Sequence, residues 1–254
     1  MFVLRDELND YLNKCLIPST FNDYCPNGLQ VEGSDKIQRI ILGVTVCQAL
    51  IDEAVIKKAD AIIVHHGLFW QGEPYPIIGM KKKRLQKLLN NDISLWGYHL
   101  PLDCHPTLGN NAQISGTLTL SNIQSHAVSG VNDLLWTGTL LETQTVASIK
   151  NTLANVFERT PLYLGNGQAE TVTNIAWCSG AAQKYIVEAK SLGAQLYFSG
   201  EVSEQTMHLA KELGIHYLAC GHHATERYGV KALAKKIEQK FSIECEYIDI
   251  DNPV

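Results

Sequence analysis

Two adjacent histidines, His65 and His66, are the residues of this sequence whose types and spacing most directly suggest chemistry. They follow the apolar run 61–64 and precede Gly67, so they stand where a short buried strand ends. Ligands of α/β sheets bind at the carboxyl ends of strands, and imidazole is a good metal ligand. The pair therefore predicts a metal site, although a hydrogen-bonded loop histidine beside a helix-capping one would give the same pattern.

A second candidate set is the segment that contains His222, His223 and Glu226. Residues four apart share one face of a helix, so His222 and Glu226 can bind one cation. Asp103 follows another predicted strand and adds a carboxylate. Simpler interpretations exist, namely a hydrogen-bonding pair at a helix start for the histidines and a turn residue for Asp103. The joint occurrence of these residues at strand ends favours the metal site.

Five of these residues are the candidate metal ligands, and all are nitrogen or oxygen donors without sulfur, namely His65, His66, Asp103, His222 and Glu226. Such donors suit Zn, Mn, Fe, Ni or Mg, and five are more than one closed tetrahedral ion uses. A carboxylate that bridges two ions would account for the surplus. The seven cysteines are scattered and form no C-x-x-C motif, which predicts reduced thiols in the cytoplasm.

Alternating helical and strand patterns must position these residues, which predicts an α/β fold. Polar loops are expected at 21–31 and 99–106. The expected helices are 4–16, 48–58, 84–89, 145–157 and 225–241, and the expected strands are 37–46, 61–64, 93–98, 134–140 and 161–164.

Residues 174–201 repeat the plan of residues 39–67, with a strand, a helix that contains Glu-Ala, and an apolar strand. The following helix and strand repeat as well. Both copies end in a histidine with a carboxylate four residues later, His99 with Asp103 and His222 with Glu226. The repeat predicts two interlocked, duplicated α/β domains with mixed sheets flanked by helices, and a shift in composition near 125–131 suggests a boundary.

Charge and hydropathy exclude some function classes. The net charge is −5, and the basic run 81–84 is interpreted as a solvated helix face, so nucleic acid is an unlikely partner. No stretch of about 18 apolar residues occurs, and the first residues are charged too early for a signal peptide. We therefore expect a soluble cytoplasmic protein that does not associate with membranes.

Four segments, 27–31, 64–67, 99–111 and 221–226, together resemble the GTP cyclohydrolase 1 type 2 homolog family, the YbgI-like dinuclear metal proteins. By that resemblance, two divalent ions bind each subunit, one through His66 and Asp103 and the other through His65 and His222, with Glu226 bridging them. The resemblance also implies a toroidal homohexamer and two domains, 1–125 plus 206–254, which binds the metals, and an inserted domain, 126–205.

The resemblance implies a metal-dependent hydrolase that acts on a purine nucleotide, by GTP cyclohydrolase-like ring opening, or on damaged nucleotides. His99 and His223 are candidate proton donors to the leaving nitrogen, or residues that orient the ligands. Phe69, Trp70 and Tyr98 are interpreted either as a surface that stacks a base or as packing. The alternative function is a metal-binding oligomeric ring with a regulatory, partner-binding or nucleic-acid-binding role and no catalysis.

Overall fold

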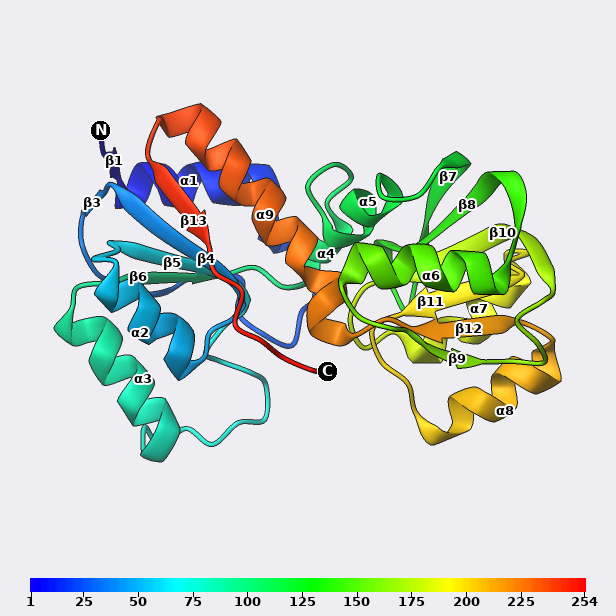
Figure 1. Ribbon diagram of the computed structural model, residues 1–254. Coiled ribbons are helices and arrows are strands. Elements are labelled where there is room, and N and C mark those ends of the chain that lie inside the picture. The colour runs from blue at the N-terminus through cyan, green and yellow to red at the C-terminus, as the bar shows by residue number, and fades with distance from the viewer. The chain divides into compact units, whose positions relative to one another are not determined.

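The chain forms two α/β units, each with its own sheet, in a computed structural model that describes residues 1–254 (Figure 1). Unit 1 comprises Met1–Leu102 with Gly229–Asp251, and unit 2 comprises Asp103–Tyr228 with Asn252–Val254. The predicted mixed α/β class is therefore confirmed. No helix is long and apolar enough to cross a membrane, and no disulfide bond is present.

Unit 1 is built on a five-stranded sheet of order β13-β4-β5-β6-β2, in which only β2 runs antiparallel to its neighbour. Its paired core residues Ile41, Ile62 and Leu95 are fully buried, as expected for apolar strands covered on both faces. These strands are β2 (Gly28–Val31), β4 (Arg39–Thr45), β5 (Ala61–His66), β6 (Ser94–Gly97) and β13 (Glu244–Tyr247), and a separate ribbon pairs β1 (Val3–Leu4) with β3 (Lys36–Ile37).

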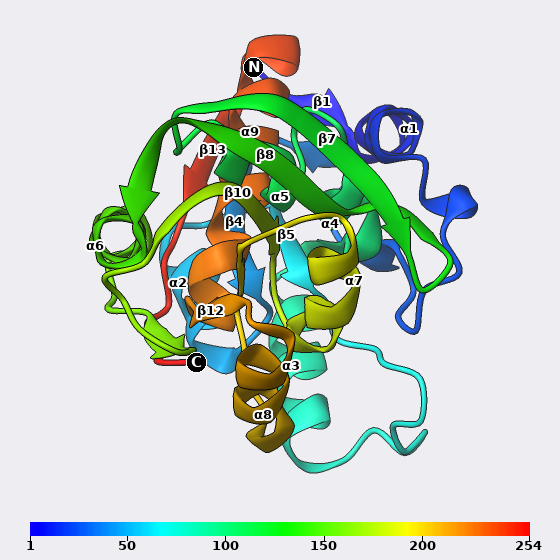
Figure 2. The ribbon, with the colours of Figure 1, turned by 90° about the vertical axis from the view of Figure 1, so that its right-hand side faces the viewer.

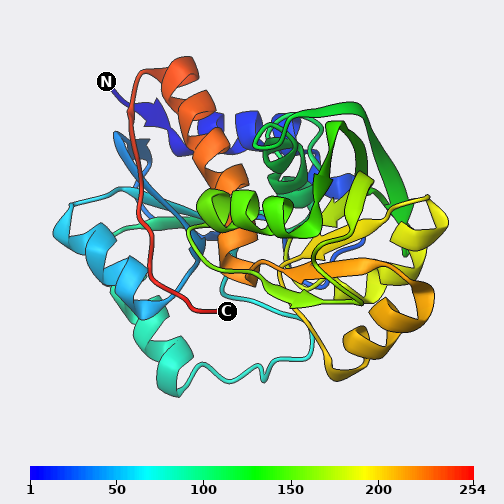
Figure 3. The ribbon, with the colours of Figure 1, turned by 45° about the vertical axis from the view of Figure 1, so that its right-hand side comes forward.

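Helices cover both faces of this sheet. One face is covered by α2 (Gln48–Ile56) and α3 (Gly79–Asn90), and the other by α1 (Arg5–Leu16) and the C-terminal part of α9 (His222–Phe241) (Figure 3). Tyr11 of α1 packs edge-on against Phe241 at the end of α9.

Unit 2 is built on a six-stranded sheet of order β7-β8-β10-β11-β12-β9. Figure 2 shows α6 on one face of this sheet and α7 and α8 on the other. The strands are β7 (Leu120–Val128), β8 (Val131–Thr145), β9 (Leu162–Leu164), β10 (Thr171–Cys178), β11 (Leu196–Ser199) and β12 (His216–Ala219). The helices are α4 (Leu100–Cys104), which begins in unit 1, α5 (Asn110–Ser115), α6 (Val146–Phe157), α7 (Ile186–Ser191), α8 (Glu204–Leu213) and the start of α9, and short 3-10 helices occur at Pro18–Thr20 and Gln183–Tyr185.

The predicted internal repeat is present in the topology of the two sheets. In each unit, three consecutive parallel strands are joined by helices, β4-β5-β6 in one and β10-β11-β12 in the other. In each unit, the third of these parallel strands also pairs with an antiparallel strand that comes earlier in the chain. These pairs are β6 with β2 in unit 1 and β12 with β9 in unit 2. The two sheets therefore share a four-stranded part of the same order, β4-β5-β6-β2 in unit 1 and β10-β11-β12-β9 in unit 2, and differ in the strands beyond it.

Local structure differs from the sequence-based expectation at three places. The composition shift near 125–131 is the turn of the β7–β8 hairpin, where Ser129 and Gly130 have φ angles of 51° and 78°. The chain passes between the two units at 102/103, 228/229 and 251/252, and the predicted domain bounds at 125/126 and 205/206 stay a prediction. The expected loops 21–31 and 99–106 contain β2 and α4, because edge pairing and a single helical turn leave little periodic signal.

Candidate metal centre

The histidine cluster of unit 1 consists of His65, His66 and His99. His65 and His66 end β5, and His99 follows β6, whose Gly97 pairs with Val64 of β5. Because the carboxyl ends of parallel neighbours meet at one sheet edge, the three imidazoles come together. One ring nitrogen of each lies within 4.8 Å of those of the other two. The cluster is thus a candidate metal-binding edge.

Each imidazole of the histidine cluster is oriented through its Nδ1 atom. His65 Nδ1 lies 2.9 Å from the carbonyl oxygen of Tyr98, and His66 Nδ1 lies 2.9 Å from Thr45 Oγ1. His99 Nδ1 lies 2.9 Å from Asp23 Oδ1. A carbonyl can only accept, so His65 must donate from Nδ1, which leaves Nε2 as the nitrogen with a lone pair. Metal-bound histidines are oriented in this way.

Asp23 fixes the position of His99. Its carboxylate also accepts hydrogen bonds from the backbone N–H of Leu100 and the side chain of Asn27, both at 3.0 Å. Burial raises the pKa of Asp23, but the hydrogen bonds, led by that from His99, outweigh burial and lower the pKa to about 2. On its other side, His99 Nε2 lies 3.3 Å from the Tyr24 hydroxyl.

Gln30 explains why glycine follows His66. Its Oε1 accepts a hydrogen bond from the backbone N–H of Leu68, and its Nε2 donates to the Pro26 carbonyl. A Cβ atom on Gly67 or Gly97 would overlap the amide group of Gln30. The segments 27–31 and 64–67 therefore act together to hold the loop that follows the two histidines.

The carboxylate cluster of unit 2 consists of Asp103, Glu201, His222 and Glu226. Asp103 and Glu226 are 5% and 2% exposed, which is unusual for acidic side chains. His222 begins α9 and lies between two carboxylates, with Nδ1 2.6 Å from Glu201 Oε1 and Nε2 3.1 Å from Glu226 Oε1. Carboxylate oxygens of Asp103 and Glu226 lie within 4.8 Å of each other. Such a concentration of acidic oxygens suits a divalent cation.

Buried neighbours hold these carboxylates. Asp103 Oδ1 accepts hydrogen bonds from Asn110 Nδ2 at 2.9 Å and Ser179 Oγ at 2.7 Å. Gly180 follows Ser179 with a φ angle of 66°, and a Cβ atom there would overlap Glu226 Oε1. Glycine is thus required beside Glu226 for both backbone and steric reasons.

The two carboxylates control the protonation of His222. Burial lowers the pKa of His222, but hydrogen bonds and charge from Glu226 and Glu201 outweigh burial and raise the pKa to about 9. The imidazole is therefore protonated at neutral pH in the absence of a competing cation. A metal ion that binds His222 must displace this proton.

The structure places the five predicted metal ligands in these two clusters, His65 and His66 in unit 1 and Asp103, His222 and Glu226 in unit 2. Their division between two shared ions stays a prediction. His223 lies in the first turn of α9, where its backbone N–H donates to the Val254 carbonyl, and its role as proton donor also stays a prediction. His105 Nδ1 accepts from the backbone of Thr107 and Leu108 and closes its own turn.

The sequence did not indicate Glu201 of the carboxylate cluster or three neighbours of the clusters, namely Asp23, Tyr24 and Ser179. Asp23 and Tyr24 belong to a segment that composition describes only as a polar loop. The internal repeat was a usable signal for Glu201, because it places the end of β11 in the same position as the end of β5.

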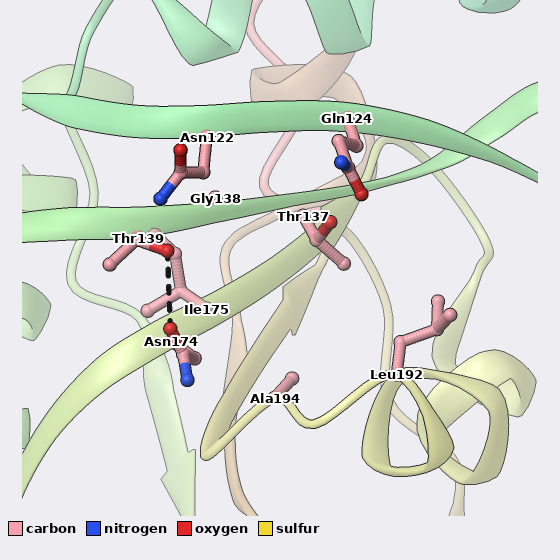
Figure 4. Close-up of a pocket in the computed structure, with 9 residues that line it drawn as sticks. All are labelled: Asn122, Gln124, Thr137, Gly138, Thr139, Asn174, Ile175, Leu192 and Ala194. Carbon is pink, nitrogen blue, oxygen red and sulfur yellow. Dashed lines mark hydrogen bonds between the residues drawn. The ribbon is translucent and has the colours of Figure 1, made fainter.

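Unit 2 also contains a cavity of about 200 Å³ that contains none of the predicted residues (Figure 4). It lies beside the amino end of β11, whereas the carboxylate cluster lies at the carboxyl end of the parallel strands. Its lining combines polar and apolar side chains without a charged one, and Thr139 Oγ1 donates a hydrogen bond of 3.2 Å to Asn174 Oδ1. The cavity is thus separate from the predicted chemistry.

The family model for Duf34/NIF3 (NGG1p interacting factor 3) matches residues 3–253, nearly the whole chain. The chain belongs to the Duf34/NIF3 family. Among its relatives, the GTP cyclohydrolase 1 type 2 homolog of Yersinia pestis is 45% identical over 247 residues, which is 97% of this chain and 98% of the relative. The homolog of the same name from Pasteurella multocida is 47% identical with the same coverage. The predicted family resemblance is confirmed.

Solved structures of similar proteins share the Duf34/NIF3 fold. The structure of protein ybgI, described as of unknown function, has a TM-score of 0.94 and 44% sequence identity, and covers 99% of this chain and 100% of that one. TTHA1606 from Thermus thermophilus has a TM-score of 0.89 and 32% identity with the same coverage. The similarity therefore extends over both units.

Proposed function

We propose that this Duf34/NIF3 protein is a hydrolase that uses two divalent metal ions. The ions are held by His65 and His66 of the histidine cluster and by Asp103, His222 and Glu226 of the carboxylate cluster. Glu226 is the bridging ligand, as the family resemblance implies. One observation carries this proposal: every histidine in the ligand set has its Nδ1 atom held by a neighbouring oxygen, which directs Nε2 as the ligand atom.

When bound, such ions supply Lewis acidity and a water nucleophile that is available near neutral pH. The chain supplies the positions of the ligands and the exclusion of water. Asp103 and Glu226 are buried, and Ser179, Asn110 and Glu201 restrict the ligand side chains to one orientation. His99, held by Asp23, and His223 are the proposed proton donors to a leaving nitrogen.

The proposed substrate is a purine nucleotide or a damaged nucleotide. Hydrolytic opening of the imidazole ring of GTP adds water and releases formate, and the name of the relatives, GTP cyclohydrolase 1 type 2 homolog, supports this reaction class. The proposal predicts metal-dependent turnover in a panel of purine nucleotides and phosphoesters, with formate measured directly. Metal-loaded protein that turns over no member of the panel would contradict hydrolysis but not metal binding.

Metal analysis of gently purified protein tests the centre itself. We expect about two divalent ions per chain, falling to one or none in Glu226→Ala. The chain offers a matched control in Glu204→Ala, because Glu204 and His208 form an exposed i, i+4 pair 3.3 Å apart that resembles the His222–Glu226 pair. The control should retain both ions. No bound metal in the wild type after incubation with Mn or Zn would contradict the dinuclear centre.

A second candidate function is supported by the family description, which names an interacting factor. In this case the metals would be structural or regulatory in a ring that binds a partner. Both candidates share a proposed homohexameric ring in the cytoplasm, which native mass spectrometry tests by the mass of the assembly. Metal binding and a hexamer without turnover, together with salt-resistant binding of a partner, would favour this second function.

A further inference from the structure

We propose that Tyr24 and Trp70 form an aromatic wall on which a planar heterocyclic substrate, such as a purine base, stacks beside the histidine cluster. This inference rests on the proposed function, because it names the substrate class of the same site. The ring centroids of Tyr24 and Trp70 lie 5.6 Å apart. The centroid of the His99 ring lies 4.9 Å from that of Tyr24 and 5.4 Å from that of Trp70. Trp70 also lies 5.7 Å from His66. The wall thus adjoins two histidines of the cluster.

Each ring is oriented by a hydrogen bond of its own side chain, which for Tyr24 is the 3.3 Å contact of its hydroxyl with His99 Nε2. Trp70 Nε1 donates to the carbonyl of Gly67 at 3.2 Å, within the loop that follows the two histidines. The carbonyl of Tyr24 accepts from the backbone N–H of Gln71 at 2.8 Å, which joins the two loops next to the rings. Rings held in this way lose little conformational freedom when a ligand stacks on them, so more of the stacking energy appears as affinity.

Exposure separates Trp70 from the other tryptophans, and Tyr24 beside it is exposed as well. Tyr24 is 52% exposed and Trp70 is partly exposed, whereas Trp96, Trp136 and Trp177 are at most 7% exposed. A rigid, open aromatic pair beside a polar cluster is typical of a ligand surface, because stacking accepts any flat π-face and the neighbouring polar groups can address ring nitrogens.

Two aromatic candidates from the sequence do not belong to the wall. Tyr98 is fully buried, and its hydroxyl donates to Asn13, so it packs in the core. Phe69 is covered by the Lys81 ammonium group, which lies 5.0 Å from its ring centroid. Of the three residues considered from the sequence, only Trp70 is placed to stack a base.

Tryptophan fluorescence tests the wall, because Trp70 is the one tryptophan of four that is not buried. The probes are guanosine, adenosine and, as a non-aromatic control, ribose, titrated into the full-length protein both with Mn²⁺ and after metal removal. We expect saturable quenching by the nucleosides and none by ribose. Trp70→Leu should abolish the quenched component, while equilibrium dialysis of labelled guanosine should show affinity weakened by about tenfold or more.

Variants of Tyr24 keep the Trp70 reporter and separate the ring from the hydroxyl. Tyr24→Leu removes the ring and should weaken guanosine binding about tenfold, whereas Tyr24→Phe keeps the ring and should stay within about threefold of wild type. Equal affinity of the wild type, Tyr24→Leu and Trp70→Leu for guanosine would overturn the proposal, as would the absence of saturable nucleoside binding in protein that retains its metals. Loss of metal binding with intact stacking would instead contradict only the proposed function.

Discussion

The sheets of the two units share a four-stranded part of the same order but carry different side chains at the carboxyl ends of its parallel strands. In unit 1 the strand ends carry imidazoles, which are oriented by a carbonyl, a hydroxyl and one carboxylate. In unit 2 they carry carboxylates around a single imidazole, and Ser179 and Gly180 stand at the end of β10. Topology thus decides where functional side chains can lie, and the residue types decide what each edge can bind.

The comparison of the two clusters predicts the largest loss of metal affinity when a metal ligand itself is substituted. If one set of ions uses both clusters, His65→Ala and Glu226→Ala should each lower metal affinity by at least about 100-fold, because a ligand contributes more than its supporting residues do. Calorimetric titration with Mn²⁺ measures the affinity. Loss of binding in one variant alone, with the other unchanged, would show that the two clusters are independent.

The two carboxylates that orient histidines, Glu201 and Asp23, should differ in how much they contribute to metal affinity. Glu201→Gln weakens the partner of the ligand His222, so we expect a roughly 10- to 100-fold loss of metal affinity at alkaline pH. Asp23→Asn acts on His99, which is outside the proposed ligand set, and should change the affinity less than about threefold. An equal loss of metal affinity in both variants would indicate that His99 is itself a metal ligand.

The same comparison predicts a pH dependence. Because the pKa of His222 is raised to about 9, its proton competes with the metal below that pH. The apparent affinity for Mn²⁺ should fall by up to about tenfold for each pH unit below 9. Removing the Glu201 charge in Glu201→Gln lowers the pKa of His222, so the fall should begin at lower pH. An affinity that is constant between pH 7 and about 9 would contradict a role for His222.

The smallest expected effect is on stability in unit 1. The pKa of Asp23 lies at about 2 in the folded protein, below the ordinary value of 3.8, so its contribution to stability is present above 3.8 and is lost as pH falls through 2. Asp23→Asn should lower the free energy of unfolding by about 1–2 kcal/mol at neutral pH. Urea unfolding should show that this difference shrinks between about pH 4 and pH 2, and a constant difference would assign it to lost packing.

The sequence predicted the parallel strands well because their apolar runs are short, continuous and followed by glycine or polar residues. Residues 61–64 and 93–98 lie in or around β5 and β6 as expected, and the helix expected at 145–157 is α6 (Val146–Phe157). Strand β7 was missed because half-exposed polar strands resemble loops in composition. The polar turn of the β7–β8 hairpin accounts for the composition shift near 125–131.

The sequence alone determined the α/β class, the internal repeat, the family resemblance and the histidines and acids that are the candidate ligands. These features depend on local periodicity, on residue chemistry and on motifs of a few residues. Only the tertiary structure identified the partners of those residues. Asp23 meets His99 and Glu201 meets His222 across 76 and 21 residues of chain. Strand pairing brings such residues together, and no local pattern records it.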